Sequence, residues 1–293
     1  MPILACANNG QLGGDHLAGV LLALLQNCML AEAAGTWRIG RELKNAVESI
    51  EDPGSRKAAT AVLETMLDPN RLKFVDVITG FEDDEESPIG EMLISQSANA
   101  DLDSIICEKL VPVGSVESTS ILAFNQSNFA RERSRKACSL IYAPGSKNAR
   151  EVLTEAFGRV ARHCEFIEVY DRQMGISMGG NYHDAIEHWC DFFVSLARGF
   201  ELRIHTTASQ AAATKRKFAE HLAGSAVSLK VFPHLEDEQP HDRFLRACGF
   251  TFDIGRGVDL FDRAGDCRDV KIGLSDHGAF TKEWRKLASG QPL

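Results

Sequence analysis

The chain has 293 residues, 44% of them hydrophobic, which is enough apolar material for one large domain or two ordinary ones. Its formal net charge of −9 argues against electrostatic attraction of nucleic acid or an anionic membrane to the whole protein surface, so any contact with a polyanion must be local. The apolar runs fall short of the roughly 18 residues of a membrane span, and the N-terminus lacks a signal peptide's basic region, so we expect a cytoplasmic protein.

The first third of the chain predicts helices that pack on one another. Three segments carry apolar residues at a helical period: residues 15–33, 41–50 and 55–67. Residues 72–79 predict a strand. We therefore expect a mainly helical N-terminal domain at residues 1–118, and we expect a protein partner to bind on its helices.

From residue 120 onward the pattern changes to alternating strands and helices. The expected strands are residues 137–142, 165–170, 200–206, 227–232, 250–254 and 269–274. The expected helices are residues 148–163, 182–197, 209–222 and 282–287. This order predicts an α/β domain at residues 119–293, with a largely parallel sheet flanked by helices and a hairpin-like pair of strands near its end.

The most informative stretch of the sequence surrounds the strand expected at residues 250–254. His241 and Arg243 are two residues apart, so their side chains share a face if the chain is extended there. Gly249 is expected to turn the chain and return the next loop to a neighbouring edge. In that loop glycines on both sides of Arg256 allow the backbone to approach an oxyanion. The stretch predicts an anion-binding or phosphodiester-cleaving site.

These residues resemble the phospholipase D superfamily, whose half-site reads His-x-Lys, then Asp, then Gly-Ser and Asn. The corresponding positions in this chain are His241, Arg243, Cys248, Gly255, Arg256 and Asp259. The His and the Gly match, whereas Arg replaces Lys, and Cys, Arg and Asp replace Asp, Ser and Asn. The series His-Asp-Arg, then Gly-Arg-Gly-Val-Asp, is more similar still to the divergent phospholipase D-like domain at the C-terminus of MIT-domain proteins, over roughly residues 164–287.

The resemblance implies a degenerate phospholipase D-like fold with an eroded catalytic set, and the eukaryotic members of this branch bind membranes. In active members two half-sites meet: one His attacks phosphorus, the other protonates the leaving oxygen, and cations hold the non-bridging oxygens. This chain carries one half-site, so catalysis by His241 and Arg243 requires a homodimer, without metal or cofactor. Standalone proteins of this shape resemble accessory subunits of bacterial phage-defence or mobile-element complexes.

A second candidate position follows the strand expected at residues 165–170. Asp171 and Arg172 come directly after it, and the carboxyl ends of parallel strands line the ligand crevice of α/β proteins. An equal alternative is that Asp171 caps the glycine-rich loop at residues 175–180. The expected phosphate-binding set is Asp171, Arg172, Arg246, Gly255, Arg256 and Asp259.

The remaining titratable clusters have simpler interpretations. His183 and His188 stand about 140° apart around a helix, so we expect no metal site there. The eight cysteines form no Cys-x-x-Cys pair and predict buried thiols in a reducing compartment. The basic runs at residues 131–136 and 215–217 are either solvated helix faces or contacts to a phosphate backbone.

Three functions stay open at this point. The leading one is a module that recognises a phosphodiester polymer, in particular a nucleic acid, without cleaving it. The second is a homodimeric, metal-independent nuclease with His241 as nucleophile. The third is a non-catalytic assembly subunit or a phospholipid-binding module, although we expect no membrane contact.

Overall fold

The computed structural model of the chain describes residues 3–7, 16–33, 38–69, 71–75, 104–106, 117–119, 123, 126–127, 139–174, 181–235, 243–275 and 291–293. The chain divides into two compact units, residues 2–137 and 138–293. This division lies later than the boundary expected between residues 118 and 119. In the described part of the chain, no helix has the length and apolar character needed to cross a membrane.

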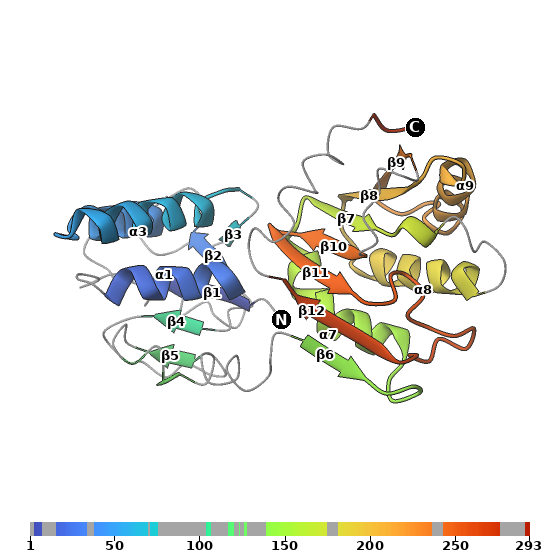
Figure 1. Cartoon of the computed structure of the whole chain (residues 1–293), viewed down its shortest axis with the longest axis horizontal. Coiled ribbons are helices and arrows are strands. Elements are labelled where there is room, and N and C mark those ends of the chain that lie inside the picture. Colours follow the sequence, from blue (N-terminus) through green and yellow to red (C-terminus); the bar gives the residue numbers. More distant parts are fainter. Residues whose placement is uncertain are drawn as a thin grey trace, which may run out of the picture. The chain divides into compact units, whose positions relative to one another are not determined.

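The N-terminal unit is an α/β unit and not the mainly helical domain that the sequence predicted (Figure 1). Its described strands are β1 (Ile3–Ala7), β2 (Cys28–Ala33), β3 (Leu72–Val75), β4 (Ser104–Ile106) and β5 (Glu117–Thr119). They form a parallel sheet in the order β3-β2-β1-β4-β5. Its described helices are α1 (His16–Asn27), α2 (Arg38–Glu48) and α3 (Pro53–Met66).

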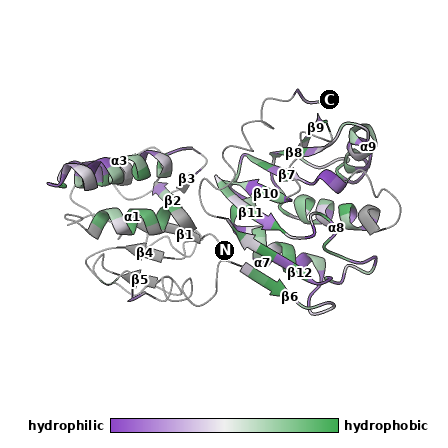
Figure 2. Ribbon diagram, viewed as in Figure 1, coloured by the Kyte–Doolittle hydropathy of each residue, from purple (hydrophilic) through white to green (hydrophobic). Residues whose placement is uncertain are grey.

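The error in the N-terminal prediction comes from the junction of α1 and β2. The strand begins at Cys28, directly after the helix ends at Asn27, and both are rich in apolar residues. Periodicity alone does not distinguish a short buried strand from a buried helix, so the sequence pattern predicts one helix that runs on to residue 33. Figure 2 shows that α1 is hydrophobic along most of its length, whereas α3 carries many hydrophilic residues.

The C-terminal unit contains a larger sheet with helices between its first strands. Its described strands are β6 (Ser139–Tyr142), β7 (Phe166–Tyr170), β8 (Phe200–Thr207), β9 (Val227–His234), β10 (Phe244–Ala247), β11 (Phe250–Ile254) and β12 (Val270–Leu274). The described helices are α7 (Ala149–His163), the short 3-10 helix η2 (Arg172–Met174), α8 (Asn181–Ser195) and α9 (Ala211–His221). These strands lie in the order β6-β12-β11-β10-β7-β8-β9.

The sheet of the C-terminal unit is mixed, which corrects the expected largely parallel arrangement. Strands β7, β8 and β9 are parallel, whereas β10, β11, β12 and β6 are each antiparallel to their neighbours in the series. The antiparallel pairing of β10 with β11 follows from the short link between them, because a parallel pair needs a long crossover. That link is Cys248-Gly249, with φ of 49° and 69°, as in the type I′ turns of two-residue hairpins.

The two faces of this sheet differ in character. One face packs against α7 and α8, where the Phe157 ring meets Phe252 edge-on at 5.1 Å and lies 5.6 Å from the Trp189 ring. The other face carries charged residues, and Glu168 there forms ion pairs with Arg203 and Arg246. Because successive side chains of a strand point to opposite faces of the sheet, these charged residues lie on the face away from α7 and α8.

Candidate functional site

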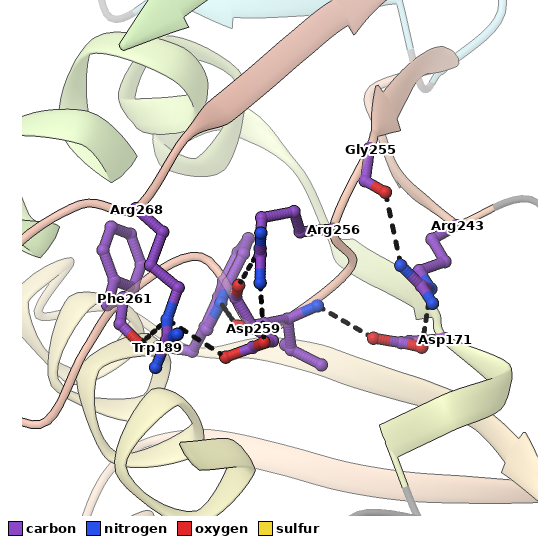
Figure 3. Close-up of polar contacts among 9 residues, drawn as sticks. Asp171, Trp189, Arg243, Gly255, Arg256, Asp259, Phe261 and Arg268 are labelled. Atoms are coloured by element: carbon purple, nitrogen blue, oxygen red, sulfur yellow. Dashed lines mark hydrogen bonds and ion pairs between the residues drawn. The ribbon is translucent and has the colours of Figure 1, made fainter. Parts of the chain in front are cut away.

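The strand register brings three of the predicted site segments to one edge of the sheet. Phe244 of β10 lies opposite Tyr170 of β7 and opposite Asp253 of β11. Asp171 therefore follows β7 where Arg243 precedes β10, and the loop from Gly255 leaves β11 at the same edge. Figure 3 shows Asp171, Arg243 and Gly255 as sticks.

The carboxylate of Asp171 is the centre of this cluster and is fully buried. Its Oδ2 accepts a hydrogen bond from the Val258 backbone N–H at 2.9 Å, and its Oδ1 accepts one from the Gln173 N–H at 2.9 Å. The Nε of Arg243 lies 3.5 Å from Oδ1, which makes an ion pair (Figure 3). Asp171 thus connects segments that are far apart in the sequence, and its contact with the Gln173 N–H orders the start of η2. The expected cap of the glycine-rich loop falls on residues 175–180, outside the described part of the chain.

The environment of Asp171 favours the neutral acid. Burial raises the pKa of Asp171 to about 6, although the Val258 N–H, the Arg243 guanidinium and the Gln173 N–H all oppose this shift. The negative charge of Asp259 acts in the same direction as burial. A carboxyl group with such a pKa changes its charge close to neutral pH, as functional groups often do.

A glycine at position 257 is required by this geometry. Its φ is +67°, and an added Cβ would lie 2.0 Å from Asp171 Oδ2 and 2.6 Å from Arg243 Cδ. The backbone at Gly257 therefore lies very close to the Asp171 and Arg243 pair. The sequence predicted such a close approach to an external anion, whereas the anion here is the carboxylate of Asp171 itself.

The N–H groups of the two glycines beside Arg256 already have acceptors within the protein, which corrects the expectation that they face an external oxyanion. The Gly255 N–H donates to the Lys271 carbonyl at 3.2 Å, and the Gly257 N–H donates to the Ile254 carbonyl at 2.7 Å. The Gly255 carbonyl accepts from Nη1 of Arg243 at 3.2 Å. These two glycines therefore offer no N–H group to an external phosphate, and we expect guanidinium groups to recognise it.

A second ion-pair group follows in the same loop. Arg256 Nη2 lies 3.4 Å from Asp259 Oδ2, and Arg268 Nε lies 3.5 Å from Asp259 Oδ1 (Figure 3). Arg268 also donates to the Phe261 carbonyl at 3.1 Å. No sequence pattern indicated Arg268, because it occupies no slot of the motif and reaches Asp259 only through the folding of the loop before β12.

The loop is also fixed to the helix layer. The indole Nε1 of Trp189, a buried residue of α8, donates to the Val258 carbonyl at 3.1 Å. Val258 is thereby bonded on both sides, through its N–H to Asp171 and through its carbonyl to Trp189. These two hydrogen bonds attach the loop after β11 to the core of the unit.

Two predicted positions lie away from the cluster. Arg246 is on the opposite sheet face, where its Nη1 lies 3.7 Å from Oε2 of the buried Glu168. Burial raises the pKa of Glu168, whereas the charges of Arg246 and Arg203 lower it. Cys248 lies at the other end of β10 from Arg243, in the hairpin turn, and its Sγ donates to the Val160 carbonyl at 3.4 Å.

Some predicted positions lie outside the residues that the structure describes. These are His241, the glycine-rich segment at 175–180, the helix at 282–287 and the basic run at 131–136. The proposed role of His241 therefore stays a prediction. Arg172 is described, and its carbonyl accepts from the Thr207 hydroxyl at 2.8 Å.

A pair of histidines beside the site was missed by the sequence analysis. Nδ1 of His205 and Nε2 of His234 are 2.9 Å apart and share a hydrogen bond, and both side chains are buried. Burial, with the charges of His234 and Arg203, lowers the pKa of His205 to about 3. Only the register of β8 against β9 brings them together, so no local motif could have shown the pair.

The ion pairs of the site contain one more positive than negative side chain. They join three arginines, Arg243, Arg256 and Arg268, to the two aspartates Asp171 and Asp259. Among the described residues, no group of three or more His, Cys, Asp and Glu side chains is placed to hold a metal ion. Neither a scan against models of known protein families nor a search of curated proteins finds a match to this chain.

Proposed function

We propose that the C-terminal unit is a degenerate phospholipase D-like module that binds a phosphodiester polymer, in particular nucleic acid, without cleaving it. We further propose that the protein acts as a cytoplasmic subunit of a bacterial phage-defence or mobile-element complex. The N-terminal unit is the part that we propose binds its protein partner. The observation that carries the binding function is the group of three arginines, Arg243, Arg256 and Arg268, that the ion pairs of Asp171 and Asp259 bring to the loop after β11.

The charges of this cluster support binding of an anion by guanidinium groups. The chain as a whole has a net charge of −9, yet these ion pairs contain one more arginine than carboxylates. Arg256 is well exposed, and Arg268 is partly exposed. Guanidinium groups bind phosphate oxygens in a planar, two-pronged manner, and such contacts do not depend on base sequence.

The eroded motif supports binding without turnover. The slot of the motif's Asp is taken by Cys248, whose thiol is bonded at the far end of β10 from Arg243. The Lys slot holds Arg243, which is engaged by the buried Asp171. A cation that is held by a carboxylate can still attract an anion, but it is less suited to stabilise a transient charge.

The test is the affinity of the full-length protein for a labelled single-stranded oligonucleotide, measured by fluorescence anisotropy at several salt concentrations. We expect Arg256→Ala and Arg243→Ala each to weaken binding by about tenfold or more. Each should also reduce the slope of log affinity against log salt by about 0.7. Arg263→Ala, which removes an exposed arginine from the same connection between β11 and β12, is the matched control and should change neither quantity appreciably.

The nuclease alternative has its own test, because the resemblance implies metal-independent catalysis. Labelled DNA and RNA, single- and double-stranded, are incubated with wild type and His241→Ala in the presence of EDTA. Cleavage that is lost in His241→Ala, by a protein that is dimeric, would replace the binding module with a phosphohistidine-type nuclease. Binding without cleavage by either protein supports the module.

One observation favours the third candidate, an assembly subunit without a ligand. The Asp171 carboxylate and the backbone N–H groups of Gly255, Gly257 and Val258 all have partners within the protein. If this is the function, Arg243→Ala and Arg256→Ala lower the stability, and neither oligonucleotides nor phospholipid vesicles bind to wild type. Binding to anionic vesicles alone would indicate the phospholipid-binding form of this candidate.

A further inference from the structure

The buried carboxylate of Asp171 and an external phosphate would compete for the same cation. Arg243 contacts Asp171 through Nε, and the Gly255 carbonyl through Nη1, and its side chain is largely buried. A phosphodiester that approaches this guanidinium brings a second negative charge close to a carboxylate that is shielded from water. Two anions beside one arginine repel each other strongly in a buried site, unless one of them is neutralised.

We propose that Asp171 takes up a proton when a phosphodiester binds at Arg243, so that the module binds its ligand more tightly in mildly acidic solution. This inference rests on the proposed binding function and adds a regulation of the same site. The proton comes from the solvent and attaches to a carboxylate oxygen of Asp171. The ligand keeps its charge throughout, because a phosphodiester does not titrate near neutral pH.

The geometry explains why Asp171, and not Asp259, is the group that responds. Asp259 is partly exposed and is shared between Arg256 and Arg268. Asp171 is fully buried, and Gly257 presses against its Oδ2, so the carboxylate cannot turn away into water. Its charge has one arginine partner at 3.5 Å. The pKa of about 6 that burial gives Asp171 places the change within reach of physiological pH.

The neighbours of Asp171 favour the same response. The titratable or charged residues on the elements packed around it include Arg243 before β10, Asp259 after β11, Arg172 in η2, Tyr170 in β7 and His205 in β8. The same strands also carry Glu168, Glu201, Arg203, Arg246 and Asp253. Asp259 disfavours the ionised form of Asp171, whereas Arg243 favours it. His205 contacts Asp171 through its backbone carbonyl, which accepts the Asp171 N–H at 3.3 Å. A bound phosphate would offset the charge of Arg243 and leave the neutral acid favoured.

The experiment uses full-length protein and a short oligothymidine, because neither its bases nor its phosphates titrate between about pH 5 and about pH 8. All variants carry His241→Gln, since histidine side chains ordinarily titrate in this range and His241 is two residues from Arg243 in the sequence. We expect the affinity to fall by up to about tenfold per pH unit above about pH 6, where the free carboxyl is ionised. Adding Asp171→Asn should flatten this dependence and raise the affinity at about pH 8 several-fold.

Calorimetry of the His241→Gln protein gives a readout that does not depend on the fold of Asp171→Asn. Titrations with the oligothymidine at about pH 7, in buffers of different ionisation enthalpy, should show that each protein chain takes up nearly one proton when it binds the ligand. Binding without proton uptake overturns the inference and leaves the proposed function intact. No binding at any pH, or equal binding of an uncharged methylphosphonate oligonucleotide, overturns the proposed function as well.

Discussion

At the scale of single residues, the site is an internal ion pair around which a loop is folded. Asp171 accepts two backbone N–H groups and lies beside Arg243, so it fills the place where the sequence predicted an external anion. Removing either partner would leave a buried charge without its counter-charge, which is among the costly single changes in proteins. The same pair is therefore part of the stability of the unit as well as of its proposed function.

The close approach at Gly257 leads to a prediction about stability. In Gly257→Ala the new Cβ meets Asp171 and Arg243, so we expect the steric clash to add about 1–3 kcal/mol to the cost of a positive φ. Gly224→Ala is the matched control, because Gly224 has φ of +79° with no atom within 4 Å of an added Cβ. The control should lose only about 1 kcal/mol. Equal losses in urea unfolding of the two variants would show that the contact with Asp171 has no cost.

The buried histidine pair leads to a prediction about how the stability of the protein changes in acid. The pKa of His205 is lowered from 6.5 to about 3, so between these values the unfolded chain binds a proton that the folded protein does not. Stability due to this residue is therefore present above pH 6.5 and is lost as the pH falls, by up to about 1.4 kcal/mol per unit. Asp171 acts in the opposite sense, because its pKa is raised from 3.8 to about 6, and its contribution increases as the pH falls through that window.

Because the two effects oppose each other, the measurement compares variants and not wild type alone. Urea unfolding is followed between about pH 4 and about pH 7 for wild type, His205→Gln and Asp171→Asn. Relative to that of wild type, the free energy of unfolding of His205→Gln should increase as the pH falls, and that of Asp171→Asn should decrease. Parallel curves for all three proteins would mean that neither group changes its pKa on folding.

At the scale of elements, the hairpin of β10 and β11 determines the site. The sequence predicted β11 at residues 250–254, because Phe250, Phe252 and Ile254 alternate with polar residues. It missed β10, since Phe244-Leu245-Arg246-Ala247 does not alternate and three of its four residues are buried. The Asp171 position was found because it follows a predicted strand. Its contact with the loop after β11 depends on the antiparallel pairing of β7 and β10, which local patterns do not specify.

The link from the loop to α8 can be tested by Trp189→Phe. The change keeps an aromatic ring against Phe157 and removes the N–H that donates to the Val258 carbonyl. We expect a loss of about 1–2 kcal/mol, because the buried carbonyl loses its partner. Hydrogen exchange should become faster at the Val258 amide, which donates to Asp171, and change little in α9. Unchanged exchange at Val258 would mean that the loop is held by Asp171 alone.

At the scale of the whole molecule, the chain consists of two α/β units with different sheets. The N-terminal sheet is parallel in its described strands, and the C-terminal sheet is mixed. The sequence predicted a change from helices to alternating strands and helices near residue 120, whereas both units are α/β and the division lies after residue 137, where no low-complexity linker marks it. Of the N-terminal strands the sequence predicted β3, within residues 72–79. It missed β4 and β5, which have three residues each, and β2, which follows a helix without a loop.

The separation of the units leads to a last prediction, about residues 138–293 expressed alone. The described contacts of the arginine cluster, of Trp189 and of the histidine pair all lie within this unit. We therefore expect the fragment to fold with a dispersed amide spectrum and to bind the oligonucleotide within about threefold of the full-length affinity, since small differences in free energy are expected from a distant unit. A folded fragment that has lost binding would place part of the ligand site in residues 2–137, and the proposed division of labour between the units would then be wrong.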